Sequence, residues 1–343
     1  MVFVTGSQGP ARRSGRSRHV RRLGQHFLLN RGVAARIVAA AELDARPPVL
    51  EIGAGRGALT DVLRTATDRL YLVEIDPGLV DVLLDRYRTD AGIAIIEGDV
   101  LALDLPLVLQ EPSVHVVGNL PYSVASQILL RIVELREWCP LAVVMLQEEV
   151  ARRVVAEPGG RDYGVLTLLV QLYADAVWCF RVSRRCFSPA PRVESAVVQL
   201  RLRAAPRVPV VDPRLFRRLV QSLFQHRRKM LRNSLEGALE GVGVSAGEAV
   251  AVLREAGIDA RVRPEQVCIE EFAALTAAVA ARCPSPGLPS LPCAPHVEAV
   301  PQPVTEVIDR EDGHHDCQRR EDSEVRCYEQ VWTRVGKHRS PGR

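Results

Sequence analysis

The amino-acid sequence predicts an α/β fold, a mostly parallel sheet with helices on both faces, followed by a small all-helical domain. Between residues 23 and 205, short apolar runs alternate with helix-like segments, which is the pattern of a parallel sheet. Most of these runs are continuously apolar, as expected for strands covered on both sides. Residues 206–282 instead show helical spacing of apolar residues, for example at Leu215, Leu219 and Leu223.

Seven segments are expected to form strands. The last two lie close together in the sequence, with no long helical segment between them, so we expect them to form an antiparallel hairpin at the end of the sheet. Beyond them, residues 212–282 should form four or five short helices. The expected strands are, in chain order, 49–52, 70–75, 93–96, 114–117, 141–146, 178–182 and 196–203.

The two ends of the chain are predicted to be disordered. Residues 1–22 form a basic arm: six arginines lie within them, and no acid precedes Glu42. Such an arm can pair with phosphates of a nucleic acid, and it is also typical of a solvated, unfolded start. Residues 283–343 are rich in proline at first and then charged with little periodicity, which indicates a disordered tail.

Composition excludes several classes of protein. The 343 residues are 47% hydrophobic with a net charge of +4, enough for a buried core and more than one domain. No apolar run approaches the roughly 18 residues that span a bilayer, and Met1–Pro10 does not have the pattern of a secretory signal. The eight cysteines include no CxxC pair, so we expect neither disulfides nor a metal site. We therefore expect the protein to be cytoplasmic.

A glycine-rich turn and two acids indicate a nucleotide-like cofactor. The strand 49–52 runs into Gly53-Ala54-Gly55, where glycines let a ligand approach the backbone. Glu74 ends the next strand, where a carboxylate can hold ribose hydroxyls, and Asp99 follows the third, where it can accept from an adenine amino group. Both acids could instead cap helices. The G-x-G-x-G spacing falls short of the NAD-type fingerprint, which disfavours a dehydrogenase.

The segment Gly118-Asn119-Leu120-Pro121-Tyr122 is the most informative one. It follows the strand 114–117 and precedes an expected helix, 123–136. The Asn119 side-chain carbonyl and the backbone carbonyl of Leu120, held extended before Pro121, can accept both hydrogens of a planar amino group. Tyr122 offers a face for base stacking, worth roughly 1–3 kcal/mol. This arrangement suits an enzyme acting on the exocyclic nitrogen of an unpaired adenine.

Further candidates lie outside this segment. Phe187, in a loop stiffened by Pro189 and Pro191, could be the second ring that sandwiches a flipped base, or it could pack in the core. Tyr163 is at least as well explained by packing. Basic side chains that could follow one helix face and bind RNA phosphates, or simply be solvated, are Arg227, Arg228, Lys229 and Arg232.

Together these segments resemble the ribosomal RNA adenine N6,N6-dimethyltransferases, in particular the bacterial small-subunit branch. The matching segments follow one another in family order across residues 23–282. They are 23–28 (LGQHFL), 51–60, 73–76, 118–122, 146–150 (LQEEV), 162–164, 187–195 and 226–235 (HRRKMLRNSL).

The resemblance implies a Rossmann-like S-adenosylmethionine-dependent methyltransferase sheet over 23–205 and a helical RNA-binding domain over 206–282. It also implies transfer of two methyl groups to each of two neighbouring adenosines in a hairpin near the 3′ end of small-subunit rRNA, within a pre-ribosomal particle. We expect a monomer that needs no metal and does not bind a membrane. By motif match, the cofactor site comprises His26, Leu28, Gly53, Gly55, Glu74, Asp99 and Asn119.

Two positions depart from the family pattern: His26 stands where Asn is usual, and Met230 where Thr is usual. Other interpretations stay open. A large-subunit rRNA adenine methyltransferase of the macrolide-resistance type shares the glycine turn and the Asn-x-Pro-aromatic motif, but does not account for the 147–150 and 227–233 segments. A DNA adenine or protein glutamine methyltransferase would not explain residues 187–195. A non-catalytic ribosome-assembly factor is disfavoured because Gly53, Glu74, Asp99 and Asn119 are all present.

Overall fold

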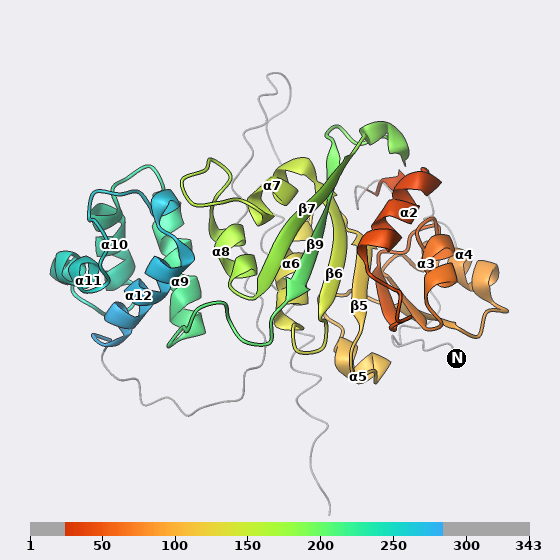
Figure 1. The fold of residues 1–343 in the computed structure, drawn as a ribbon, viewed down its shortest axis with the longest axis horizontal. Helices are drawn as coiled ribbons and strands as arrows, with labels where there is room; N and C mark the ends of the chain where they lie inside the picture. Colours follow the sequence, from red (N-terminus) through yellow and green to blue (C-terminus); the bar gives the residue numbers. More distant parts are fainter. Residues whose placement is uncertain (1–24, 284–343) are drawn as a thin grey trace, which may run out of the picture. The chain divides into compact units, whose positions relative to one another are not determined.

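The computed structural model describes residues 25–283 (Figure 1). The predicted disordered arm, 1–22, and all but the first residue of the predicted tail, 283–343, lie outside this range. Contacts divide the chain into Met1–Ala299 and Val300–Arg343, and every described residue belongs to the first unit. The boundary expected near residue 205, between a catalytic and a helical domain, therefore stays a prediction.

A seven-stranded sheet forms the centre of the first part of the chain. Its order is β4-β3-β2-β5-β6-β9-β7; β4 to β6 are parallel, and β9 runs antiparallel between β6 and β7. The antiparallel pairing of β7 with β9 confirms the expected hairpin. The strands are β2 (Val49–Ile52), β3 (Leu70–Glu74), β4 (Ile93–Glu97), β5 (His115–Asn119), β6 (Leu141–Gln147), β7 (Ala174–Val182) and β9 (Ser195–Leu202).

Helices cover the sheet on both sides, as the alternating pattern predicted. In Figure 1, α2, α3 and α4 lie together on one side of the strands, and α6, α7 and α8 lie on the other. The helices of this part of the chain are α2 (Arg31–Ala40), α3 (Thr60–Ala66), α4 (Pro77–Tyr87), α5 (Leu105–Leu109), α6 (Ala125–Glu134), α7 (Glu148–Val154) and α8 (Val165–Gln171). Local signals set their starts: Asn30 caps α2 and Asp76 caps α4, each accepting a backbone N–H of the first turn.

The core of this part is built from the continuous apolar runs. All seven residues of β6 except Gln147 are buried, as are all four residues of β2, including the acid Glu51. Val117, Val143, Met145 and Val197, which come from three neighbouring strands, belong to one buried cluster. Strands of this kind need cover on both faces, which explains why their apolar residues do not alternate with polar ones.

A second, two-stranded sheet was not expected from the sequence. β1 (Phe27–Leu28) pairs antiparallel with β8 (Phe187–Ser188), which follows the short helix η1 (Arg184–Cys186). Two residues per strand carry too little alternation to be recognised in the sequence. The pairing joins two segments 160 positions apart, and it fixes the start of the described chain against the end of β7.

Four α-helices form the end of the described chain. Asp212 caps α9 with bonds from the Arg214 and Leu215 amides, and Pro213 starts the helix. Phe216 and Phe272 are fully buried between these helices. This confirms a C-terminal helical region of four or five short helices. The elements are α9 (Pro213–Gln225), α10 (Leu231–Glu240), η2 (Ala246–Glu248), α11 (Ala249–Glu255), η3 (Pro264–Gln266) and α12 (Ile269–Ala280).

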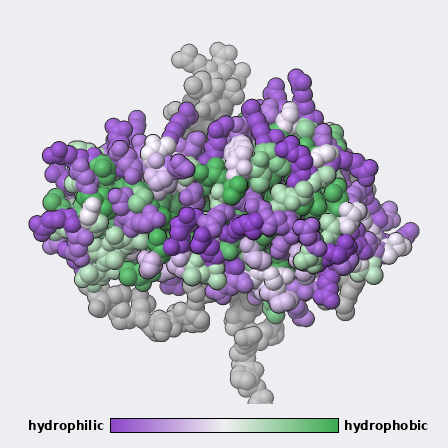
Figure 2. All heavy atoms as spheres, in the orientation of Figure 1, coloured by the Kyte–Doolittle hydropathy of each residue, from purple (hydrophilic) through white to green (hydrophobic). Residues whose placement is uncertain are grey.

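Contacts tie the helical region to the sheet region. The Tyr163 hydroxyl donates to the Val267 carbonyl at 3.0 Å, and its ring lies 6.3 Å from that of Phe224. Tyr163 is 2% exposed, so packing accounts for it. Hydrophilic side chains cover much of the face seen in Figure 2, with apolar residues in small groups among them. Among residues 25–283, the helices are too short or too polar to cross a bilayer.

Candidate active site

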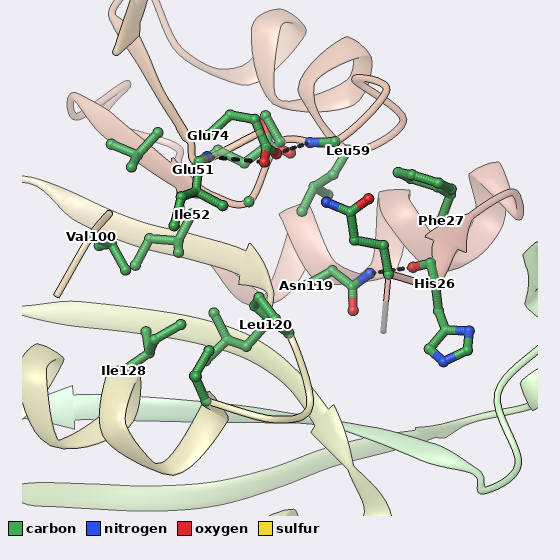
Figure 3. Close-up of a pocket in the computed structure, with 18 of the residues that line it drawn as sticks. His26, Phe27, Glu51, Ile52, Leu59, Glu74, Val100, Asn119, Leu120 and Ile128 are labelled. Atoms are coloured by element: carbon green, nitrogen blue, oxygen red, sulfur yellow. Dashed lines mark hydrogen bonds between the residues drawn. The ribbon is translucent and has the colours of Figure 1, made fainter. Parts of the chain in front are cut away.

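A cavity of about 190 Å³ lies at the carboxyl ends of the parallel strands (Figure 3). Strands of an open α/β sheet bring these ends to one edge, which is where such folds bind ligands. The cavity brings together the glycine turn, both predicted acids and the Asn119–Tyr122 segment. Its wall is formed by residues 25–28, 51–56, 58–59, 73–75, 98–101, 119–124 and 128.

The glycine turn after β2 adopts the conformation that only glycine takes easily. Gly53 and Gly55 have φ values of +71° and +58°, in the left-handed region. The Gly53 amide donates to the Val73 carbonyl at 2.9 Å, which ties the turn to β3. A Cβ at Gly118, on β5, would lie 2.7 Å from the Ile52 carbonyl oxygen. Glycine at position 118 therefore allows β5 to lie close to β2.

Backbone amides, rather than a basic side chain, hold the carboxylate of Glu74 in place. Its carboxylate accepts from the Gly55 amide at 2.9 Å and from the Ile75 and Asp76 amides at 3.0 and 3.1 Å. Burial raises the pKa of Glu74, and these three hydrogen bonds oppose that rise. Asp76, not Glu74, caps the following helix. Glu74 thus lies in the cavity wall, fixed in orientation, where the sequence placed a ribose-binding carboxylate.

Asp99 also lines the cavity, in the loop after β4. One of its oxygens accepts from the Leu101 amide at 2.9 Å, which closes a tight turn. This bond orients the carboxylate without using its second oxygen. The structure thus brings Gly53, Glu74 and Asp99 together at one edge of the sheet, as predicted. Which ligand they bind stays a prediction.

Asn119 is the last residue of β5, so the strand extends two residues further than expected, through Gly118. Its side-chain Nδ2 donates to the backbone carbonyl of His26 at 3.0 Å (Figure 3). Because the amide nitrogen is used in this way, Oδ1 points away from that carbonyl and is left to accept. The Leu120 amide donates to the Met145 carbonyl at 3.1 Å, which anchors the turn that follows.

Tyr122 is held in place by its hydroxyl. That group lies 2.7 Å from Ser195 Oγ, at the start of β9, and burial raises the pKa of Tyr122. The ring of His26 lies 5.4 Å from the Tyr122 ring, centroid to centroid, with an angle of 32° between the planes. Both residues belong to the cavity wall, as do Leu120 and Pro121. The sequence thus identified a turn whose four residues all face one cavity.

Phe187 lies elsewhere. It is 4% exposed, belongs to β8 and packs in the core cluster that includes Leu28 and Val182. The expectation of an exposed loop residue is wrong, because pairing of β8 with β1 buries the ring. Phe187 is not among the residues of the cavity wall, and its stacking on a base stays an untested prediction.

The basic residues after α9 were expected to follow one helix face, and the structure shows that they do not. Arg227, Arg228 and Lys229 lie in the turn between α9 and α10, and only Arg232 is helical. Arg227 donates through Nε and Nη2 to Glu265 at 2.9 and 2.6 Å and to the Arg161 carbonyl at 3.0 Å. Arg227 therefore holds neighbouring segments together, whereas Arg228 and Lys229 are exposed. Phosphate binding by the four residues stays a prediction.

Two residues of the cavity wall, Glu51 and Gln25, were not predicted from the sequence as site residues. Glu51 is fully buried and accepts from the Thr60 hydroxyl at 2.6 Å; burial raises its pKa to about 8. The buried side-chain oxygen of Gln25, Oε1, has no hydrogen-bond partner among the described residues. Gln25 lies within the segment 23–28 that carries the family resemblance, and Glu51 is the one acid in an apolar strand. These two sequence features could therefore have identified Gln25 and Glu51 as candidate site residues.

The sheet order, the closing antiparallel strand and the cavity at the strand ends define the Rossmann-like class of S-adenosylmethionine-dependent methyltransferases. Within that class the chain belongs to the family described as ribosomal RNA adenine dimethylase, whose model matches residues 16–275.

Curated relatives agree with this assignment. The chain is 42% identical over 255 residues to a ribosomal RNA small subunit methyltransferase A of Syntrophotalea carbinolica, covering 74% of this chain and 94% of that one. It is 40% identical over 262 residues to the protein of the same name from Shouchella clausii, covering 75% and 88%. The match thus spans most of each relative and about three quarters of this chain.

Solved structures show the same fold. A dimethyladenosine transferase from Plasmodium falciparum superposes with a TM-score of 0.65 at 23% identity, covering 75% of this chain and 98% of that one. The 23S rRNA methyltransferase ErmE superposes with a TM-score of 0.56 at 28% identity, covering 74% and 99%.

Proposed function

We propose that this protein transfers methyl groups from S-adenosylmethionine to N6 of two adjacent adenosines in a hairpin near the 3′ end of small-subunit rRNA, giving N6,N6-dimethyladenosines. The observation that carries the proposal is that the Asn119–Tyr122 turn shares one cavity with Gly53, Glu74 and Asp99. The substrate follows from relatives about 40% identical that are named small-subunit methyltransferases. We further propose that it acts as a monomer on a pre-ribosomal particle in the cytoplasm.

The residues present fit S-adenosylmethionine. The glycine turn offers backbone atoms without side-chain obstruction, and the Glu74 and Asp99 carboxylates suit ribose hydroxyls and an adenine amino group. The unpartnered, buried Gln25 Oε1 in the same wall is an acceptor that a bound ligand would satisfy. By motif match, His26 and Leu28 complete the site. When bound, S-adenosylmethionine supplies a methyl group on a positively charged sulfur.

The protein's own part in the reaction is to prepare the amino group. The nitrogen lone pair of adenine N6 is delocalised into the ring, so it is a weak nucleophile. Asn119 Oδ1 and the Leu120 carbonyl accept the N6 hydrogens, favour a pyramidal nitrogen and direct its lone pair. Tyr122 stacks on the base once it has left its helix. Positioning and preorganised polar groups then provide most of the rate enhancement, and the surplus proton leaves to water.

Incubation with labelled S-adenosylmethionine and unmodified ribosomal subunits tests this proposal. We expect label in small subunits and none in large ones. Label in the large subunit would favour the second candidate, a large-subunit adenine methyltransferase, for which the likeness to ErmE is the relevant observation. Tight binding to small subunits without any label would instead favour an assembly factor that does not catalyse.

A further inference from the structure

We propose that four exposed arginines, which lie outside the cavity and beside its 25–28 wall, bind phosphates of the rRNA strand that carries the target adenosines. The inference rests on the proposed function and deepens it, because it names a surface that holds the substrate. This surface belongs to a different part of the chain from the 227–232 cluster that was expected to contact RNA. The four residues, called the β1–β8 patch from here on, are Arg31, Arg184, Arg185 and Arg192.

The pairing of β1 with β8 brings two distant segments of the chain together. Phe27 lies opposite Ser188 in this pairing, and the Leu29 amide donates to the Cys186 carbonyl at 2.8 Å. In Figure 1, the short green helix that follows β7 accordingly lies beside the start of α2. Residues 25–28, which include β1, also form part of the cavity wall. An RNA strand whose adenosine enters the cavity therefore passes close to the β1–β8 patch.

The protein does not neutralise the positive charge of this patch. No acid lies among residues 25–41 or 183–193. All four arginines are exposed, and none of their guanidinium groups forms an ion pair or a hydrogen bond with another described residue. By contrast, Arg181, which precedes the loop, pairs with Glu148 at 2.8 Å. Four guanidinium groups are thus available to bind anions from solution.

The acid that follows the loop does not alter this balance. Glu194 accepts a hydrogen bond from the backbone amide of Arg184 at 3.1 Å, and its carboxylate has no printed contact with a guanidinium of the patch. The carboxylate therefore holds the turn of the loop, and the side chain of Arg184 stays directed to solvent contacts. The patch keeps a net positive charge even when Glu194 is counted with it.

The backbone that carries the four side chains is fixed against the cavity wall. The Ser183 hydroxyl accepts from the Arg185 amide at 3.3 Å, and Asn30 caps the start of α2. The Pro189 carbonyl lies 2.8 Å from Nδ1 of His26, which links the loop to the wall. Phosphates bound by the patch are therefore held at a set distance from the cavity, which positions the RNA strand before the reaction.

The chemistry of the patch favours RNA over other anionic partners. Guanidinium groups bind phosphates through charge-assisted N–H bonds, often in pairs. Several such groups on one surface suit a partner that offers phosphates at regular intervals, which is the backbone of a nucleic acid. Phosphate contacts fix register and add affinity, but they carry no base specificity. The choice of adenine is left to the Asn119–Tyr122 turn.

Arg184→Ala/Arg185→Ala tests the inference in the full-length protein. We expect the dissociation constant for unmodified small subunits to rise by about 10-fold or more at about 0.1 M salt. The slope of log K against log salt concentration should become shallower by about 1.4 to 1.8. Arg184→Lys/Arg185→Lys keeps both charges and should retain most of the slope. The matched control, Arg88→Ala/Arg254→Ala, removes two exposed charges from other parts of the molecule and should leave the slope unchanged.

The reaction step should be affected much less than binding. At saturating small subunits, the single-turnover rate of Arg184→Ala/Arg185→Ala should fall by less than about 3-fold, because the patch does not touch the reacting atoms. Arg31→Ala/Arg192→Ala should lower affinity in the same direction. Thermal unfolding checks that each variant is folded. An unchanged salt slope in both double variants, or a loss confined to the rate at saturation, would overturn the inference.

A short single-stranded RNA separates the inference from the proposed function. Arg184→Ala/Arg185→Ala should weaken binding of a fluorescein-labelled oligoadenylate, measured by anisotropy, and should make its salt slope shallower as well. This result without methylation of any subunit would refute the proposed function and leave the patch as an RNA-binding surface. Normal methylation of small subunits with both slopes unchanged would refute the patch alone. A slope change with subunits but not with the oligonucleotide would assign the patch to a ribosomal protein and also overturn the inference.

Discussion

Asn119 is the side chain on which the proposed chemistry most depends. Its Nδ2 donates to the His26 carbonyl, which leaves Oδ1 to accept from the amino group in the reaction we propose. The sequence motif alone indicated the residue type and its place near a strand end. It did not show which amide atom would be available, because the partner, His26, is 93 positions away.

Asn119→Ala should lower single-turnover methyl transfer by about 10²-fold or more, the usual effect of removing one preorganised polar group. Affinity for S-adenosylmethionine should fall far less than the rate, because Asn119 is only one member of the expected cofactor site and Gly55, Glu74 and Asp99 remain. Rapid-quench transfer assays and calorimetric titration measure the two quantities. Gln127→Ala, on α6 and outside the cavity wall, is the matched control. Turnover close to that of the wild type would remove Asn119 from the mechanism.

Glu51 should make the protein less stable as pH rises. Burial raises its pKa to about 8 from 4.5, with Glu74 and Asp61 adding to the rise. Between these two values the unfolded chain loses the proton and the folded chain keeps it, so the free energy of unfolding falls with pH through this window. Glu51→Gln keeps an acceptor for Thr60 and cannot ionise.

We expect the wild type, relative to Glu51→Gln, to lose on the order of 3 kcal/mol of unfolding free energy between pH 5 and pH 8. Urea denaturation of both proteins without cofactor measures this difference. The variant should keep a residual slope, because burial also raises the pKa of Glu74. Parallel pH profiles for the two proteins would show that Glu51 is ionised in the folded state at neutral pH.

Among the elements, strands marked by continuous apolar runs were predicted well, whereas β7 begins at Ala174, earlier than the expected 178, and the two-residue strands were missed. β2 was predicted to the residue, and β6 and β9 to within one residue at each end, because continuous apolar runs mark buried strands. The pairing of β1 with β8 was missed, since two-residue strands have no periodicity. That pairing buries Phe187, and the ring that lies beside Tyr122 is that of His26.

The turn between α9 and α10 should contain both a structural and an RNA-binding arginine. Arg228→Ala/Lys229→Ala should make the slope of log K against log salt concentration, for binding to small subunits, shallower by about 1.4 to 1.8. Each phosphate that is no longer neutralised accounts for about 0.7–0.9 of that change. Filter binding at several salt concentrations measures the slope. Arg214→Ala/Arg254→Ala removes two exposed charges from other parts of the helical region and is the matched control.

Arg227→Ala should behave differently, because its guanidinium is occupied by Glu265 and the Arg161 carbonyl. We expect it to lower the free energy of unfolding by about 1 kcal/mol and to change the salt slope less than the double substitution does. A slope unaffected by Arg228→Ala/Lys229→Ala would mean that this turn does not contact phosphates. A large slope change in Arg227→Ala without loss of stability would reverse the assignment of roles.

For the molecule as a whole, the motifs along the chain predicted the fold class, the family and the edge of the sheet that carries the cavity. Gly53, Glu74, Asp99 and Asn119 each lie at or just after the end of a strand at that edge. What the sequence could not supply were contacts between distant segments. Tyr163 with Val267 joins the sheet and helical regions across 104 positions, and Arg227 with Arg161 does so across 66. These contacts depend on side-chain directions that are set only by packing of the complete fold.

The central claim is that one cavity prepares the N6 of an unpaired adenosine in small-subunit rRNA. Mass spectrometry of RNA fragments, after reaction of unmodified small subunits with the wild-type protein, tests it most directly. We predict four methyl groups, two on N6 of each of two neighbouring adenosines near the 3′ end. Methyl groups on ribose, on another base or at scattered adenosines would contradict the account.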